Sequence, residues 1–106
     1  MAWPKKNTRK ITVNGIEFLW HLSKNSIDSK ETLITAGSQH DRFFLFIDPY
    51  PWEFEIKPAH ISAAVEWASK QGWNPETGPS KYLAFSAKAQ KFVWLPDGIK
   101  HLHQIE

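Results

Sequence analysis

The sequence predicts an α+β fold with one main helix, residues 58–71, packed on one face of an antiparallel sheet. Three observations support this prediction: an Asn-Gly turn between alternating strands, a wholly apolar run over residues 43–47, and one helical pattern bounded by Pro and Gly. Hairpin-built strands on either side of the helix give about five to seven strands in all. The 106 residues are enough for one domain, 1–106.

The first hairpin is predicted from the dipeptide Asn14-Gly15 within the alternating stretch 10–22. Asn-Gly suits the two positive-φ positions of a type I′ turn. Such a turn sets the register by pairing Val13 with Ile16, and the register assigns every side chain to a face. The face expected to be buried carries Ile11, Val13, Ile16, Phe18, Trp20 and Leu22.

A second hairpin is predicted over residues 31–36 and 42–48, with Gly37 and Ser38 in its loop. The later strand is apolar at every position of 43–47. Because such a strand is typically covered on both faces, we expect it to be central in the sheet.

The helix is predicted to begin at Pro58, because proline suits the first helical position. Gly72 stands where a left-handed residue ends a helix, and Trp73 follows it, where it can fold back onto the last turn. Pro75 prevents any continuation. The apolar residues that recur at helical spacing are Ile61, Ala64, Val65 and Ala68.

Two further strands are predicted over residues 81–86 and 91–95, followed by the turn Pro96-Asp97-Gly98. Residues 99–105 fit either a last strand or a terminal tail.

Composition excludes several classes of protein. Six Trp, seven Phe and two Tyr make 14% of the chain aromatic, which is incompatible with intrinsic disorder. The absence of cysteine excludes a disulfide scaffold and cysteine-ligated metal sites. No apolar run approaches the ~18 residues of a membrane span, and none follows the N-terminal charges as in a secretory signal. We therefore expect a cytoplasmic protein without a membrane partner or a cofactor.

Several of these elements together resemble a loose group of small uncharacterised bacterial proteins. The shared features are an N-terminal Asn-Gly hairpin, here residues 11–18 with Trp20, and a helix ending in Gly-Trp-x-Pro, here residues 72–75. The similarity spans most of residues 10–85. It implies a bacterial, cytoplasmic protein of one domain, and it brings no known activity and no functional residue.

The strongest functional signal is a proline-rich stretch that we call the acidic aromatic segment, residues 48–55 (Asp-Pro-Tyr-Pro-Trp-Glu-Phe-Glu). Tyr and Trp are frequent anchors of protein interfaces. No nucleophile elbow, phosphate loop or dinucleotide fingerprint accompanies it. We therefore expect a non-enzymatic interaction module of the immunity or accessory type, whose partner is another protein or a second copy. The expected binding residues are Tyr50, Trp52, Glu53 and Glu55.

A second hypothesis is weak nucleic-acid binding by a basic N-terminal arm. Residues 1–30 hold six Lys or Arg against two Asp or Glu, whereas residues 31–60 hold two against five. Basic side chains beside an aromatic ring are typical of single-strand binding. A flexible, solvated arm over residues 1–9 explains the same charges, so this hypothesis ranks second. The residues concerned are Trp3, Lys5, Lys6, Arg9 and Lys10.

Two sets of residues have metal-ligand chemistry. Asp48, Glu55 and Lys57 follow the order of acids and lysine found in metal-dependent nucleases, with oxygen ligands suited to Mg²⁺. A charged edge strand explains these residues better, so the metal-dependent enzyme ranks last among the hypotheses. His101 and His103 have the spacing of two ligands on one side of a strand. A polar tail accounts for them too, so no metal site is assigned.

Overall fold

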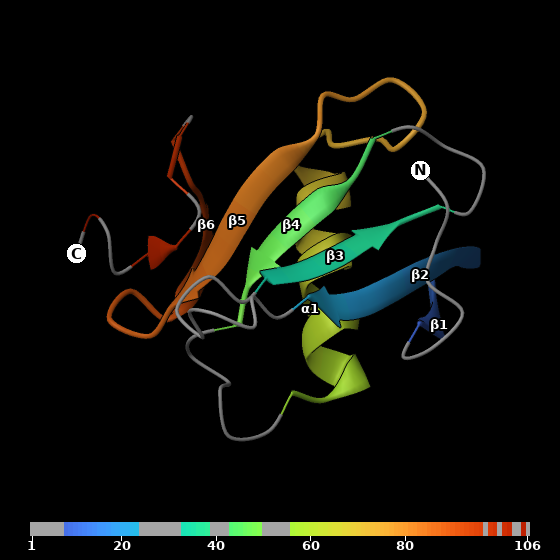
Figure 1. The fold of residues 1–106 in the computed structure, drawn as a ribbon, viewed down its shortest axis with the longest axis horizontal. Helices are drawn as coiled ribbons and strands as arrows, with labels where there is room; N and C mark the ends of the chain where they lie inside the picture. Colours follow the sequence, from blue (N-terminus) through green and yellow to red (C-terminus); the bar gives the residue numbers. More distant parts are fainter. Residues whose placement is uncertain are drawn as a thin grey trace.

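A computed structural model describes residues 8–23, 33–38, 43–49, 56–96, 98–99, 101–102 and 105. It contains a six-stranded sheet in the order β1-β2-β3-β4-β5-β6, with the helix α1 (Pro58–Lys70) across one face (Figure 1). The predicted α+β class and the single main helix are confirmed. The strands are β1 (Arg9–Val13), β2 (Ile16–Ser23), β3 (Leu33–Gly37), β4 (Leu45–Asp48), β5 (Lys81–Ser86) and β6 (Lys91–Trp94).

The first hairpin has the predicted turn and register. Asn14 and Gly15 have φ angles of 53° and 80°, and Val13 pairs with Ile16. The alternating pattern wrongly predicts that Ile16 is buried. Ile16 is 57% exposed, because it lies at the start of β2, next to the turn. The other predicted members of that face are buried or half-buried.

The strand β4 is central, as predicted, with β3 antiparallel on one side and β5 parallel on the other. Its Leu45 and Ile47 are fully buried and belong to the core cluster that also contains the helix residues. The antiparallel pattern therefore holds for every pair of neighbours except β4 and β5. A helix between two strands returns the chain to the end of the sheet where it started, so the two strands run parallel.

The helix ends in the predicted left-handed cap. Gly72 has a φ of 98°, its N–H donates to the carbonyl of Ser69 at 3.1 Å, and the N–H of Trp73 donates to the carbonyl of Ala68 at 3.0 Å. These two bonds satisfy carbonyls that the last turn would otherwise leave unpaired. The side chains that α1 buries are Ile61, Ala64, Val65 and Ala68, as predicted.

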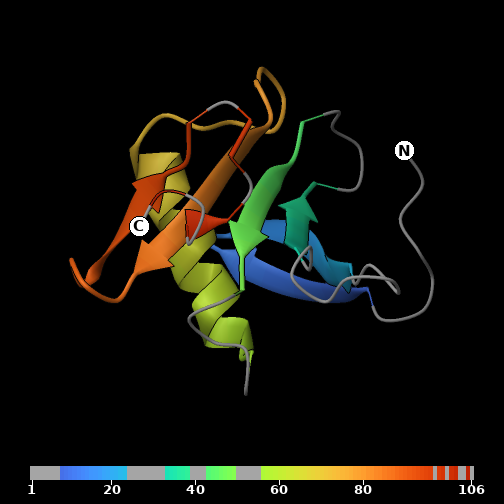
Figure 2. The ribbon, with the colours of Figure 1, turned by 60° about the vertical axis from the view of Figure 1, so that its left-hand side comes forward.

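Side chains are packed on both faces of the sheet. The main core lies between α1 and the sheet. A second cluster contains Ala84, Leu95 and Leu102. Figure 2 shows the C-terminal segment, in red, on the face of the sheet opposite α1. Residues 98–99, 101–102 and 105, described near the C-terminus, contain no strand. No helix in the described part of the chain has the length and apolar character needed to cross a membrane.

Candidate functional site

The acidic aromatic segment joins β4 to α1. Its Tyr50, Trp52, Glu53 and Glu55 lie outside the described residues. Both of its flanks are described. On one side Asp48 is fully buried, and on the other Ile56 packs against the main core. The segment therefore starts and ends at positions that are held by the folded domain.

The basic arm is described only in part, because Trp3, Lys5 and Lys6 lie outside the described residues. Arg9 and Lys10 are both exposed in β1. Neighbouring residues in a strand point to opposite faces, so these two cations do not share one surface. The guanidinium of Arg9 lies 5.8 Å from the centre of the Trp20 ring, an arrangement typical of a cation–π contact.

The nuclease-like residues occupy different environments. Asp48 is buried, Lys57 is exposed just before α1, and Glu55 lies outside the described residues. His101, which was expected in a polar tail, is buried, and His103 is also outside the described part. Among the described residues, no group of three or more His, Asp or Glu side chains is placed to hold a metal ion.

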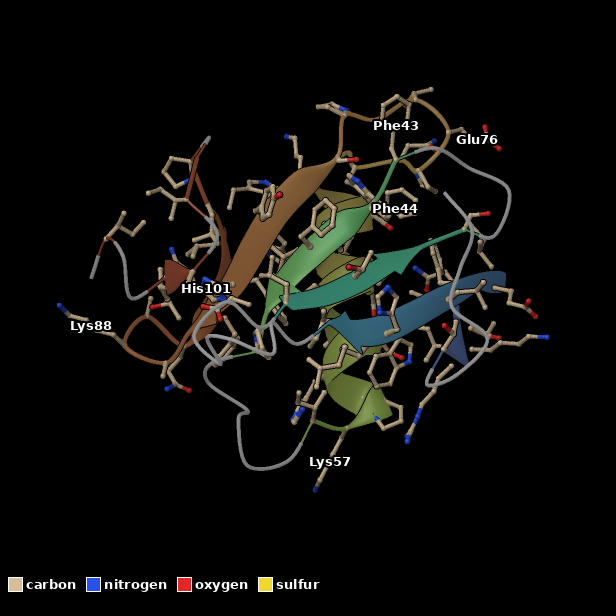
Figure 3. The ribbon with its side chains drawn as sticks, in the orientation of Figure 1. Phe43, Phe44, Lys57, Glu76, Lys88 and His101 are labelled. Atoms are coloured by element: carbon tan, nitrogen blue, oxygen red, sulfur yellow. The ribbon has the colours of Figure 1, made fainter. Side chains whose placement is uncertain are left out.

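Three buried polar residues belong to the ends of β4 and β5 and to the C-terminal segment: Asp48, Ser86 and His101. Figure 3 labels His101. The Oδ2 of Asp48 accepts a hydrogen bond from the N–H of Leu102 at 3.0 Å. The Oγ of Ser86 accepts one from the N–H of Ala89 at 3.1 Å, inside the turn between β5 and β6. These bonds hold the C-terminal segment and the turn in place.

Half-exposed rings gather on the helix face of the sheet at the β6 edge. Trp67 of α1 lies 4.9 Å from Trp94 and 5.9 Å from Phe92, measured between ring centres. Phe85 meets Phe92 edge to face at 5.2 Å. The Nζ of Lys81 lies 4.7 Å from the centre of the Trp94 ring. A helix and two strands thus contribute to one ring cluster.

Two exposed lysines lie at the two ends of β5, beside this ring cluster. Lys81 opens β5, and Lys88, labelled in Figure 3, lies in the turn between β5 and β6. Lys91 opens β6 opposite Ser86 and points to the other face of the sheet, away from Phe92. No Asp or Glu occurs in the sequence between Glu76 and Asp97. We call the combined surface the aromatic–basic surface; it consists of Trp67, Phe85, Phe92, Trp94, Lys81 and Lys88.

No motif in the sequence predicts this surface, although the sequence carries one signal for it. The hairpin over residues 81–96 combines three lysines and four aromatic residues with no acid. The sequence pattern places the aromatic residues of this hairpin in strands. It does not show that Trp67 meets them, because that contact depends on how α1 packs on the sheet.

Among the described residues, His21 has a pKa that departs from its ordinary value. Burial lowers the pKa of the His21 imidazole below its ordinary value, because desolvation disfavours the charged form. A hydrogen bond with the backbone of Leu22 opposes the shift only in part. His21 lies in β2 opposite Thr35 of β3.

Comparison of the chain with family models, with curated proteins and with solved structures gave no match. Functional proposals therefore rest on the chemistry and placement of this chain's own residues.

Proposed function

We propose that the chain is a small, non-enzymatic protein-interaction module of the cytoplasm of a bacterium, and that it binds its partner through the acidic aromatic segment. The partner is another protein, or a second copy of the chain. The residues assigned to binding are Tyr50, Trp52, Glu53 and Glu55.

The observation that supports this proposal is the position of the segment between β4 and α1. The segment follows the carboxyl end of β4, whose neighbour β5 runs parallel to it. Loops held by a rigid scaffold frequently carry binding residues.

The chemistry of the segment supports a protein partner. Its prolines restrict the backbone, which lowers the conformational entropy lost when a partner binds. Aromatic side chains offer a large contact area with few rotatable bonds. The neighbouring carboxylates favour a partner with a basic surface, because charge complementarity speeds association.

The test compares the double variant Tyr50→Ala/Trp52→Ala with the matched control Glu76→Gln. Glu76 is exposed and lies outside the segment. Sedimentation velocity from 1 to 500 µM, concentrations set by the experimenter, measures self-association, and quantitative capture from bacterial lysate measures other partners. We expect the double variant to lose at least about tenfold in association, as for the removal of interface anchors. Unchanged association in both measurements would overturn the proposal.

A further inference from the structure

We propose that the aromatic–basic surface is a second binding site, and that its ligand is single-stranded nucleic acid. This proposal concerns residues on α1, β5 and β6, and it is independent of the acidic aromatic segment.

The rings of this surface remain partly accessible, unlike those of the main core. Trp67, Phe92 and Trp94 are half-buried, whereas Trp20 and Trp73 are buried against the helix side of the sheet. An unpaired base can stack on a ring whose edge or face is reached by solvent. Base–aromatic stacking accepts any base, because every base has a π-face.

The lysines lie at both ends of the ring cluster. Lys81 is at the Trp94 end of the β5–β6 hairpin, and Lys88 is at the turn. With a rise of ~3.3 Å per residue, the length of β5 separates these ends by roughly 17 Å. Rings with cations on both sides match the pattern of single-strand sites, in which bases stack while lysines neutralise phosphates.

The charge around the surface also favours a polyanion. The nearest acidic side chain along α1 is Glu66, next to Trp67, and it forms an ion pair with Lys70 at 3.2 Å. The two lysines of the surface face no acidic residue of the hairpin itself.

The number of lysines sets the expected salt dependence. For single strands, the slope of log K against log salt is about −0.7 for each neutralised phosphate, so two contacts give about −1.4. The double variant Lys81→Gln/Lys88→Gln removes both lysines of the surface, so the slope of log K against log salt should approach zero. Both substituted side chains are exposed, so the fold is preserved.

The experiment measures fluorescence anisotropy of a labelled 15-nucleotide oligo-dT, and of a duplex, from 25 to 200 mM salt. We expect saturable binding of the single strand, weaker binding of the duplex, and a loss of about tenfold or more in the double lysine variant. Trp94→Leu keeps an apolar side chain but removes the indole, and it should weaken binding at least about fivefold. Lys57→Gln, an exposed lysine at the other end of α1, is the matched control and should bind normally.

Several results would overturn this proposal. No binding at 25 mM salt, or unchanged binding in the double lysine variant, would remove the site. Loss of binding on deletion of residues 1–7, with the lysine variant unaffected, would assign binding to the basic arm instead. Equal binding of a polyglutamate peptide of the same charge would show that an acidic protein segment, rather than a nucleic acid, is the ligand.

Discussion

Replacement of Asp48 tests how the C-terminal segment is held on the sheet. Asp48 is 0% exposed, and its carboxylate accepts the N–H of Leu102, a residue 54 positions away in the chain. Asp48→Ala removes this acceptor and leaves a buried N–H without a partner. Asp48→Asn keeps an oxygen acceptor at the same place but removes the charge.

The magnitude follows from the type of hydrogen bond. A hydrogen bond to a charged group contributes about 1.5–3 kcal/mol, and a buried donor left unpaired loses about 1–3 kcal/mol. Because the bond is buried at 3.0 Å, we expect Asp48→Ala to lower the free energy of unfolding by at least about 1.5 kcal/mol. Asp48→Asn should lose less, about 1 kcal/mol, since a neutral acceptor remains.

The assay is urea denaturation followed by tryptophan fluorescence and by far-UV circular dichroism, combined with hydrogen exchange at the Leu102 amide. A domain of this size is expected to unfold in one transition, so the linear extrapolation applies. The amide of Leu102 should exchange more than about tenfold faster in Asp48→Ala. Glu17→Ala is the matched control, because Glu17 is an exposed acid in β2, and it should change stability by less than about 0.5 kcal/mol.

Two results would refute this reasoning. One is an Asp48→Ala variant as stable as the original chain within about 0.5 kcal/mol. The other is a stability loss without faster exchange at Leu102, which would show that Asp48 acts through contacts other than this hydrogen bond.

Three further predictions concern the rest of the fold. The pKa of His21 is lowered in the folded state, so below pH 6.5 the folded chain binds fewer protons than the unfolded chain. The free energy of unfolding should therefore fall as the pH drops through this range. His21→Gln should flatten this pH dependence, measured by urea titrations from pH 7.5 to 5. Ala64→Leu should lower stability by about 1–3 kcal/mol, because Ala64 is fully buried between α1 and the sheet, while Ala63→Leu on the exposed side should be nearly neutral in the same assay. Gly78→Ala should lower the melting temperature more than Gly15→Ala: both have positive φ, which costs an alanine about 1–2 kcal/mol, but only the Cβ at Gly78 would also collide with a phenylalanine ring. Equal melting temperatures for the two glycine variants would contradict this.

Local elements were predictable because their signals act over a few residues. The type I′ turn at Asn14-Gly15 sets the register of the first hairpin, since that dipeptide tolerates the two positive φ angles. Proline at the start of α1 and Gly72 after it mark the ends of the helix through backbone conformation alone. The strand bounds 81–86 were predicted correctly for the same reason.

The candidate sites were less predictable. The acidic aromatic segment and the N-terminal arm were found from composition, and they remain predictions because their key residues lie outside the described part of the chain. The aromatic–basic surface was missed because its rings come from α1 and from β6, and no local pattern shows that they meet.

The sequence by itself determined the class of fold, the register of the first hairpin and the ends of the helix, through turn chemistry, alternation and capping. Only the tertiary structure decided that β4 and β5 run parallel, that Asp48 is buried under Leu102, and that Trp67 meets the β6 rings. These features depend on contacts between residues far apart in the chain, and such contacts depend on how all the elements pack together. The fifteen aromatic residues of the chain illustrate the difference, because composition counts the rings and packing decides which of them remain accessible to a ligand.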